Sequence, residues 1–162
     1  AGSSLSLMIN EFVKDYEIAK RAKVGFPLGV SLSDVLPFHF EAPYSLNSSG
    51  LLISNLQSYR SIIAGPIEND LTKTDNLYEY LSELSATRND ALLADLILTE
   101  LDESIDLLNK MDIPFRKSLE IPSEKEKIEA LYKNMQESVV LLKTDMVSAM
   151  GILINYQDND GD

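Results

Sequence analysis

Apolar residues recur every three or four positions along most of the chain, the spacing that places them on one face of an α-helix. The first such stretch begins at Leu5, and Gly25 and Pro27 are expected to end it. A long irregular segment follows, in which Pro37 and Pro43 forbid a continuous helix. Connections of this length are usually functional or packed against the rest of the domain.

The same spacing returns four more times after this irregular segment. Ser123 and Glu126 have the spacing of a capping box at the start of the last stretch, and Gly151 is suited to follow its end. The alternating pattern of strands is almost absent, and no clean internal repeat is evident. The expected helices span residues 49–63, 77–84, about 87–111 and 123–150.

This succession predicts an all-α fold: an antiparallel four-helix-type bundle with a long irregular loop between the first two helices. We expect residues 1–162 to form a single helical bundle domain, because this length is typical of one domain and 44% of the residues are hydrophobic. No apolar run reaches the roughly 18 residues that a membrane span needs.

Charge and cysteine content exclude several functions. The chain has 14 Lys and Arg against 26 Asp and Glu, a formal net charge of -12. Nucleic acid is therefore not an expected partner, because phosphate binding needs a basic face. The absence of cysteine excludes disulfides, thiolate zinc sites and cysteine nucleophiles.

Few side chains suggest chemistry by themselves. His39, the only histidine, lies two positions before Glu41, so the pair could offer a nitrogen and an oxygen to a metal. A tight site needs three or four ligands, and a loop histidine between two buried phenylalanines is the simpler interpretation. Glu103 and Asp106 share a helical face, but without a Glu-x-x-His motif they are expected to be solvated.

The chain closes with acidic residues at alternate positions, Asp158, Asp160 and Asp162. This spacing imitates the start of an EF-hand calcium loop. A glycine belongs at the sixth position of that loop, whereas Gly161 stands at the fourth, so a complete EF-hand is not expected. A weak partial cation site remains open.

Three further stretches carry motifs: "AKVGFPLG", "FEAPYSLNSSGLLISNLQSYRSIIAG" and "MGILINYQDNDGD". In this order they resemble the imelysin family. "MGILINYQDNDGD" is similar to the family's apolar segment followed by Asn and Asp residues. "AKVGFPLG" resembles its Lys-x-Gly-x-Pro-Leu-Gly segment. "FEAPYSLNSSGLLISNLQSYRSIIAG" resembles its Glu-x-x-Tyr-Ser segment and the Asn-containing helix after it. The resemblance covers most of the chain.

The resemblance implies two consecutive helical bundles, exported to the bacterial periplasm or held at the outer membrane as a lipoprotein, and associated with iron uptake. The family's peptidase label rests on a Gly-x-His-x-x-Glu motif in the N-terminal bundle. His39 does not stand in that context, so this chain resembles only the C-terminal bundle. The implied partner is an N-terminal bundle, in the same protein or on a separate chain.

The resemblance also implies site residues near the junction between bundles. Glu41, Asp158 and Asp160 are the implied ligands of iron or another divalent cation. The implied interface residues are Tyr44, Ser45 and Asn55. Three functions stay open: a binding module completed by the other bundle, a supporting domain of a metallopeptidase, and a non-catalytic bundle that binds other cell-envelope proteins.

Overall fold

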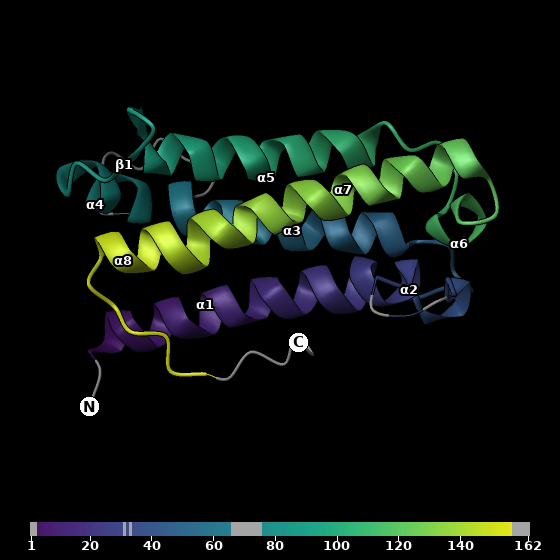
Figure 1. The fold of residues 1–162 in the computed structure, drawn as a ribbon, viewed down its shortest axis with the longest axis horizontal. Coiled ribbons are helices and arrows are strands. Elements are labelled where there is room, and N and C mark those ends of the chain that lie inside the picture. The colour runs from purple at the N-terminus through teal and green to yellow at the C-terminus, as the bar shows by residue number, and fades with distance from the viewer. Residues whose placement is uncertain (1–2, 31, 33, 66–75, 157–162) are drawn as a thin grey trace.

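The computed structural model describes residues 3–30, 32, 34–65 and 76–156. Within them, four long helices run antiparallel to their neighbours in sequence, as Figure 1 shows, and the prediction of an all-α bundle is confirmed. These helices are α1 (Ser4–Lys20), α3 (Ser48–Ala64), α5 (Leu93–Asn109) and α7 (Pro122–Val140). A short helix, α4 (Leu77–Glu83), precedes α5, and α6 (Phe115–Ser118) precedes α7.

The first helix extends further than its sequence predicted. After α1 the chain passes through a π-helical turn, η1 (Arg21–Gly25), into α2 (Phe26–Leu28), so Gly25 and Pro27 do not end it. The wider π turn relieves the clash that a proline ring makes inside a regular helix. The helix ends instead at Gly29, whose φ of 80° favours glycine. A short 3-10 turn, η2 (Pro37–His39), interrupts the loop that follows.

The last helix begins one residue earlier than expected and lacks the capping box. Pro122 occupies its first turn, where the missing N–H costs nothing, and no side chain caps Ile121. Ser123 and Glu126 therefore lie inside the helix. A second π turn, η3 (Leu141–Met146), continues α7 into α8 (Val147–Ala149). Gly151 follows the end with a φ of 63°, as predicted.

The expected helix from about residue 87 begins later, at Leu93, because a small hairpin precedes it. Strand β1 (Thr87–Arg88) pairs antiparallel with β2 (Ala91–Leu92). Asn89 and Asp90 form the two-residue turn with φ values of 51° and 65°. Asn and Asp tolerate this left-handed conformation, so the turn breaks the helical pattern that the apolar spacing predicts.

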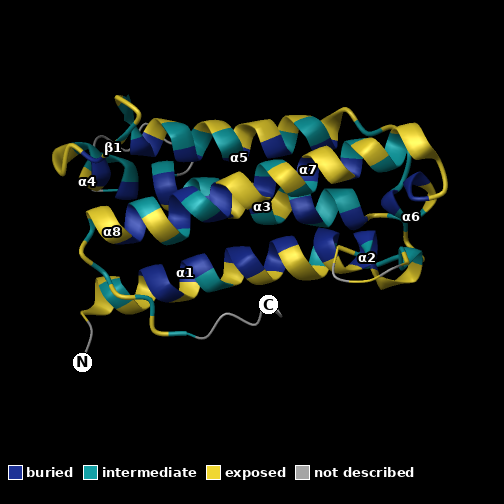
Figure 2. Cartoon of the chain, in the orientation of Figure 1, coloured by how far each residue is buried: buried dark blue, intermediate teal, exposed yellow. Residues whose placement is uncertain are grey.

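One continuous core lies between the long helices, and their outward faces are exposed, as Figure 2 shows. Among the helices formed by the described residues, none is both long enough and apolar enough to cross a membrane. The largest buried side chains include Tyr16, Phe40, Phe115, Leu52, Leu56 and Ile97.

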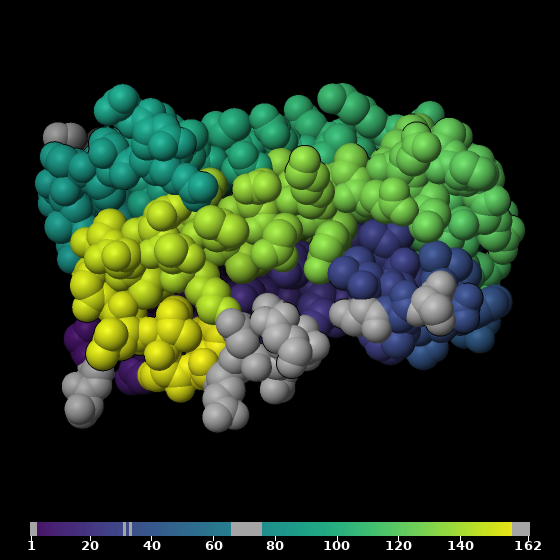
Figure 3. All heavy atoms as spheres, in the orientation of Figure 1, coloured from purple at the N-terminus to yellow at the C-terminus, as the bar shows by residue number. Residues whose placement is uncertain are grey.

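The segment after α8 turns back along α1 without forming a strand. The buried Asn10 side chain donates to the Leu153 carbonyl (3.1 Å) and accepts from the Asn155 N–H (2.9 Å). Further along α1, the Tyr156 hydroxyl donates to the Glu17 carboxylate at 2.7 Å. Figure 3 shows these C-terminal residues, in yellow, against the purple N-terminal part of the chain.

Candidate functional site

Two of the three stretches that carry the family resemblance, residues 22–29 and 40–65, are joined at one end of the bundle by Lys23. This residue lies in η1, Glu41 in the following loop and Asn55 on α3. The Lys23 ammonium forms an ion pair with the Glu41 carboxylate and donates to Asn55 Oδ1 at 2.6 Å. The ion pair is partly exposed to solvent, so its main effect is to fix the loop's position rather than to stabilise the whole fold.

The loop next to this network has an unusual backbone. Ala42 and Leu46 adopt φ values of 50° and 59°, which side chains with a Cβ rarely adopt. Hydrogen bonds hold the turn: the Ser45 hydroxyl donates to the Ala42 carbonyl (3.1 Å), and the Ser48 hydroxyl donates to the Glu41 carbonyl (2.5 Å). Such strain persists where the surroundings enforce it, and it concentrates at functional sites.

Tyr44, between these two strained residues, is 81% exposed, the second-largest exposure among the large apolar side chains that the structure describes. Its ring lies 6.1 Å from that of Phe38, which is 60% exposed. The Arg116 guanidinium of α6 stacks over Phe38 at 5.0 Å. We call Phe38, Tyr44 and Arg116 the aromatic surface. It presents two rings and a cation to solvent on a loop whose backbone is held in place.

The expectation that His39 lies between two buried phenylalanines is half wrong. Phe40 is buried, with its ring 5.0 Å from that of Phe115, but Phe38 points into solvent. The 3-10 turn of η2 separates the two rings, because successive residues in such a turn face different sides. His39 itself is exposed and makes an edge-to-face contact with Phe26 at 5.4 Å.

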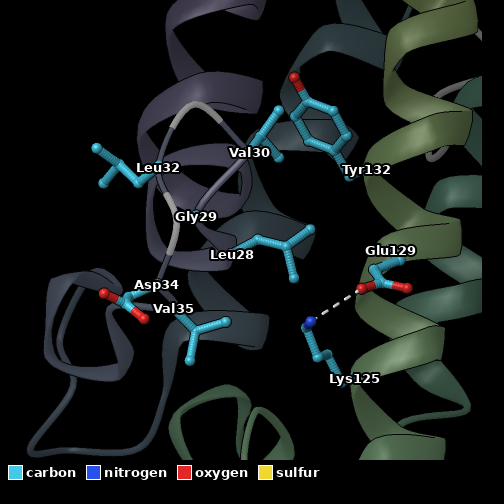
Figure 4. A pocket seen from close by; sticks show the side chains of 9 residues that line it. All are labelled: Leu28, Gly29, Val30, Leu32, Asp34, Val35, Lys125, Glu129 and Tyr132. Atoms are coloured by element: carbon cyan, nitrogen blue, oxygen red, sulfur yellow. Dashed lines mark ion pairs between the residues drawn. The ribbon is translucent and has the colours of Figure 1, made fainter.

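A cavity of about 400 Å³ opens beside the glycine that ends the first helix. Figure 4 shows Leu28 of α2 and Val35 of the following loop pointing towards α7, whereas Asp34 points to the other side. Across the cavity, Lys125 and Glu129 pair at 3.2 Å. The volume is within the range of small-molecule sites, but the charges of Lys125 and Glu129 offset each other.

The implied metal ligands are only partly described. Glu41 is engaged by Lys23, so a metal ion would have to compete with that ammonium. Asp158 and Asp160 lie outside the described residues. Within the described ranges, no three His, Asp or Glu side chains already converge as a metal site. The metal site therefore stays a prediction.

The implied interface residues lie at the same end of the bundle, and their role at an interface stays a prediction. Asn55 belongs to the Lys23 network, and Tyr44 and Ser45 occupy the strained turn. No motif marked Arg116 or Phe38, since Arg116 is distant in the chain and Phe38 is a residue type expected in the core. Lys23 belongs to the segment that resembles Lys-x-Gly-x-Pro-Leu-Gly, so the sequence could have indicated it as a site residue.

The imelysin model (peptidase family M75) matches residues 1–142, which include the whole of this loop end. The chain belongs to the imelysin family. The match covers α1, the loop, α3, α5 and α7, so the family assignment does not depend on the C-terminal acidic residues. No curated protein and no solved structure matches this imelysin chain.

Proposed function

We propose that this imelysin chain is a non-catalytic binding module: the C-terminal bundle of an exported bacterial protein associated with iron uptake, with a loop end that forms an interface with a second helical bundle. The observation that carries the proposal is the aromatic surface. Its Tyr44 is 81% exposed on a turn fixed by two hydrogen bonds, beside the network of Lys23.

The residue types and their rigidity support binding. Tyrosine and arginine are enriched among the residues that contribute most to protein interfaces. A side chain that is already held in one orientation loses less conformational entropy when a partner covers it. The aromatic surface has both properties, because the strained turn orients Tyr44 and the Arg116 guanidinium stacks on Phe38.

The proposal includes a cation, iron or another divalent ion, at the same end. Glu41 would supply one carboxylate and the tail residues Asp158 and Asp160 two more. Support comes from the resemblance and from the place of Glu41 in the Lys23 network. Release of Glu41 from Lys23 on partner binding would free the carboxylate for the metal.

The test uses the bundle encoded upstream of this chain, produced separately and titrated into the 162-residue chain by calorimetry. We expect Tyr44→Ala to weaken binding by about tenfold or more, as removal of a central interface tyrosine does. Tyr80→Ala is the control, because Tyr80 is a partly exposed tyrosine of α4, remote from α2 and α6. Equal affinity for the wild-type and Tyr44→Ala chains, or an upstream frame that encodes no second bundle, would refute the interface.

A second candidate function follows from the name of the matching model, which marks a peptidase family. Here the bundle would support a metal-dependent active site on the other bundle. Proteolysis by the two-bundle protein that is lost on chelation and restored by metal would favour it. The same Tyr44→Ala variant would then lower activity through assembly and not through the metal.

A further inference from the structure

The charges of this chain are unevenly distributed along the bundle. Residues 20–50 and 109–129 hold eight of the 14 Lys and Arg but only seven of the 26 Asp and Glu. The described residues of these two ranges lie at the loop end, the end of the bundle that carries the aromatic surface, where Figure 1 labels α2 and α6. The loop end is therefore close to neutral, whereas the rest of the chain has 19 acidic residues against six basic ones.

This distribution restricts where an acidic protein can bind. Exposed charges act on one another over roughly a Debye length, which is about 8 Å at physiological ionic strength. An acidic protein surface would meet an excess of negative charge along most of the bundle and no such excess at the loop end. Repulsion of this kind selects the face that a partner approaches.

Three cations at the loop end lack a carboxylate partner. Lys110, Arg116 and Lys117 lie on the short connection from α5 to α7. None of them forms an ion pair within the part of the chain that the structure describes, whereas seven other Lys and Arg do. Carboxylates outnumber cations almost two to one in this chain, so a general scarcity of carboxylates is not the reason.

The Arg116 guanidinium is held in place without an anion. The buried ring of Phe115 packs 5.0 Å from that of Phe40, which fixes α6 against the loop. Arg116, the next residue, lies over the Phe38 ring at 5.0 Å. A phenyl ring contains no hydrogen-bonding oxygen, so the N–H donors of Arg116 keep their capacity to bind a carboxylate.

We propose that the second bundle binds the aromatic surface through an acidic patch, with one carboxylate paired to Arg116 and others close to Lys117. This patch would belong to the interface proposed above, so the inference rests on that function. A guanidinium and a carboxylate form parallel hydrogen bonds of defined geometry. The pair would therefore also set the orientation of the partner on the rings of Phe38 and Tyr44.

An acidic protein patch fits the loop end better than an anionic membrane does. A lipid surface attracts a protein through the summed charge near it, and at the loop end cations and carboxylates nearly cancel. A protein carboxylate can be placed directly against Arg116. Its ion pair is short-ranged and directional, so it does not depend on the net charge of the surroundings.

The experiment titrates the bundle encoded upstream into the 162-residue chain by calorimetry, in about 0.05 M and about 0.5 M NaCl. Lys117→Glu is compared with Lys133→Glu, which makes the same charge change at an exposed lysine of α7 beyond the loop end. In low salt we expect Lys117→Glu to weaken binding by about tenfold or more, because it places like charges across the interface, and Lys133→Glu by less than about twofold. In high salt the difference between the two variants should shrink, because salt screens the charges.

Two variants of Arg116 separate its charge from its packing. Arg116→Gln should weaken binding by about tenfold, and Arg116→Lys should recover part of that loss in low salt, because it keeps the charge but not the geometry of the guanidinium. A purely structural role of Arg116 would give the same loss for both variants at both salt concentrations. That result would overturn the proposal.

The remaining outcomes distinguish this inference from the proposed function. Equal affinities of the Lys117→Glu and Lys133→Glu chains would overturn the acidic patch, and a loss of binding with Tyr44→Ala in the same experiment would leave the interface itself intact. An upstream bundle that does not bind the wild-type chain would refute both. Binding to vesicles of phosphatidylglycerol and phosphatidylcholine that Lys117→Glu abolishes, with no effect on the upstream bundle, would assign the cations to a membrane and overturn the proposal.

Discussion

The Asn10 side chain joins the C-terminal segment to α1. The variant Asn10→Ala should measure how much this connection contributes to the free energy of unfolding. The amide is 1% exposed and makes three hydrogen bonds: to the Ser6 carbonyl within its own helix (2.9 Å), to the Leu153 carbonyl (3.1 Å) and from the Asn155 N–H (2.9 Å). Only the last two cross from the helix to the segment. Alanine removes all three and keeps the helix, because alanine is the best helix former.

The size of the effect follows from these two bonds. Each intramolecular hydrogen bond contributes about 1 kcal/mol net, and an unsatisfied buried partner adds to the loss. We therefore expect Asn10→Ala to lower the free energy of unfolding by about 2 kcal/mol, which for a domain of this size lowers Tm by roughly 4–8 °C. The loss has an upper limit, because a terminal segment that detaches regains its bonds from water.

Urea denaturation measures the stability, and amide hydrogen exchange at Asn155 locates the change. A chain shortened to end at Gly151 completes a double-mutant cycle. In that shortened chain, Asn10→Ala should lower the free energy of unfolding only by the contribution of the hydrogen bond to the Ser6 carbonyl. The reasoning fails if exchange at Asn155 is as slow in the variant as in the wild type, or if the substitution costs the same in the shortened chain.

Three further predictions concern a glycine pair, a carboxylate and a buried ring. Gly29→Ala should destabilise the fold by more than about 2 kcal/mol in a thermal melt, because the new Cβ would lie 2.4 Å from the Asp34 carbonyl oxygen, whereas Gly151→Ala meets open space and should cost only about 1 kcal/mol. The pKa of Glu100 is raised in the fold, first by burial, so ionisation of this group favours unfolding as pH rises above its pKa in the unfolded chain. Glu100→Gln should therefore stabilise the chain at pH 7, and urea titrations should show the gain vanishing near pH 4. Phe40→Ala should cost about 3 kcal/mol, because the ring is 2% exposed; a loss below 1 kcal/mol would show that Phe40 does not anchor the loop.

Apolar spacing predicted the long helices well, because each buries one face against the others. The helix expected over 49–63 is α3 (Ser48–Ala64), and the one expected over 77–84 is α4 (Leu77–Glu83). The errors lie where local geometry overrides the pattern. A π turn lets the helix pass Pro27, and a two-residue turn at Asn89 delays α5, although both regions keep helical spacing.

The candidate site was predictable only where a motif named its residues. Tyr44, Ser45 and Asn55 came from the resemblance, and the structure brings them to the end of the bundle where Lys23 joins the motifs. Contacts such as that of Arg116 with Phe38 depend on the path of α6, which no local pattern encodes.

The π turns have a consequence for the length of the chain. A π turn accommodates one more residue than an α turn, so η1 and η3 can absorb a one-residue insertion or deletion. In a regular helix, the same change would alter the direction in which every later residue faces. Deleting one residue from η3 should restore a regular helix there, because the π turn holds one residue more than an α turn. Val147 should then stay buried, and the C-terminal segment should still reach Asn10. Alignments of imelysin sequences should therefore place single-residue gaps within these two turns and not in the loops beside them.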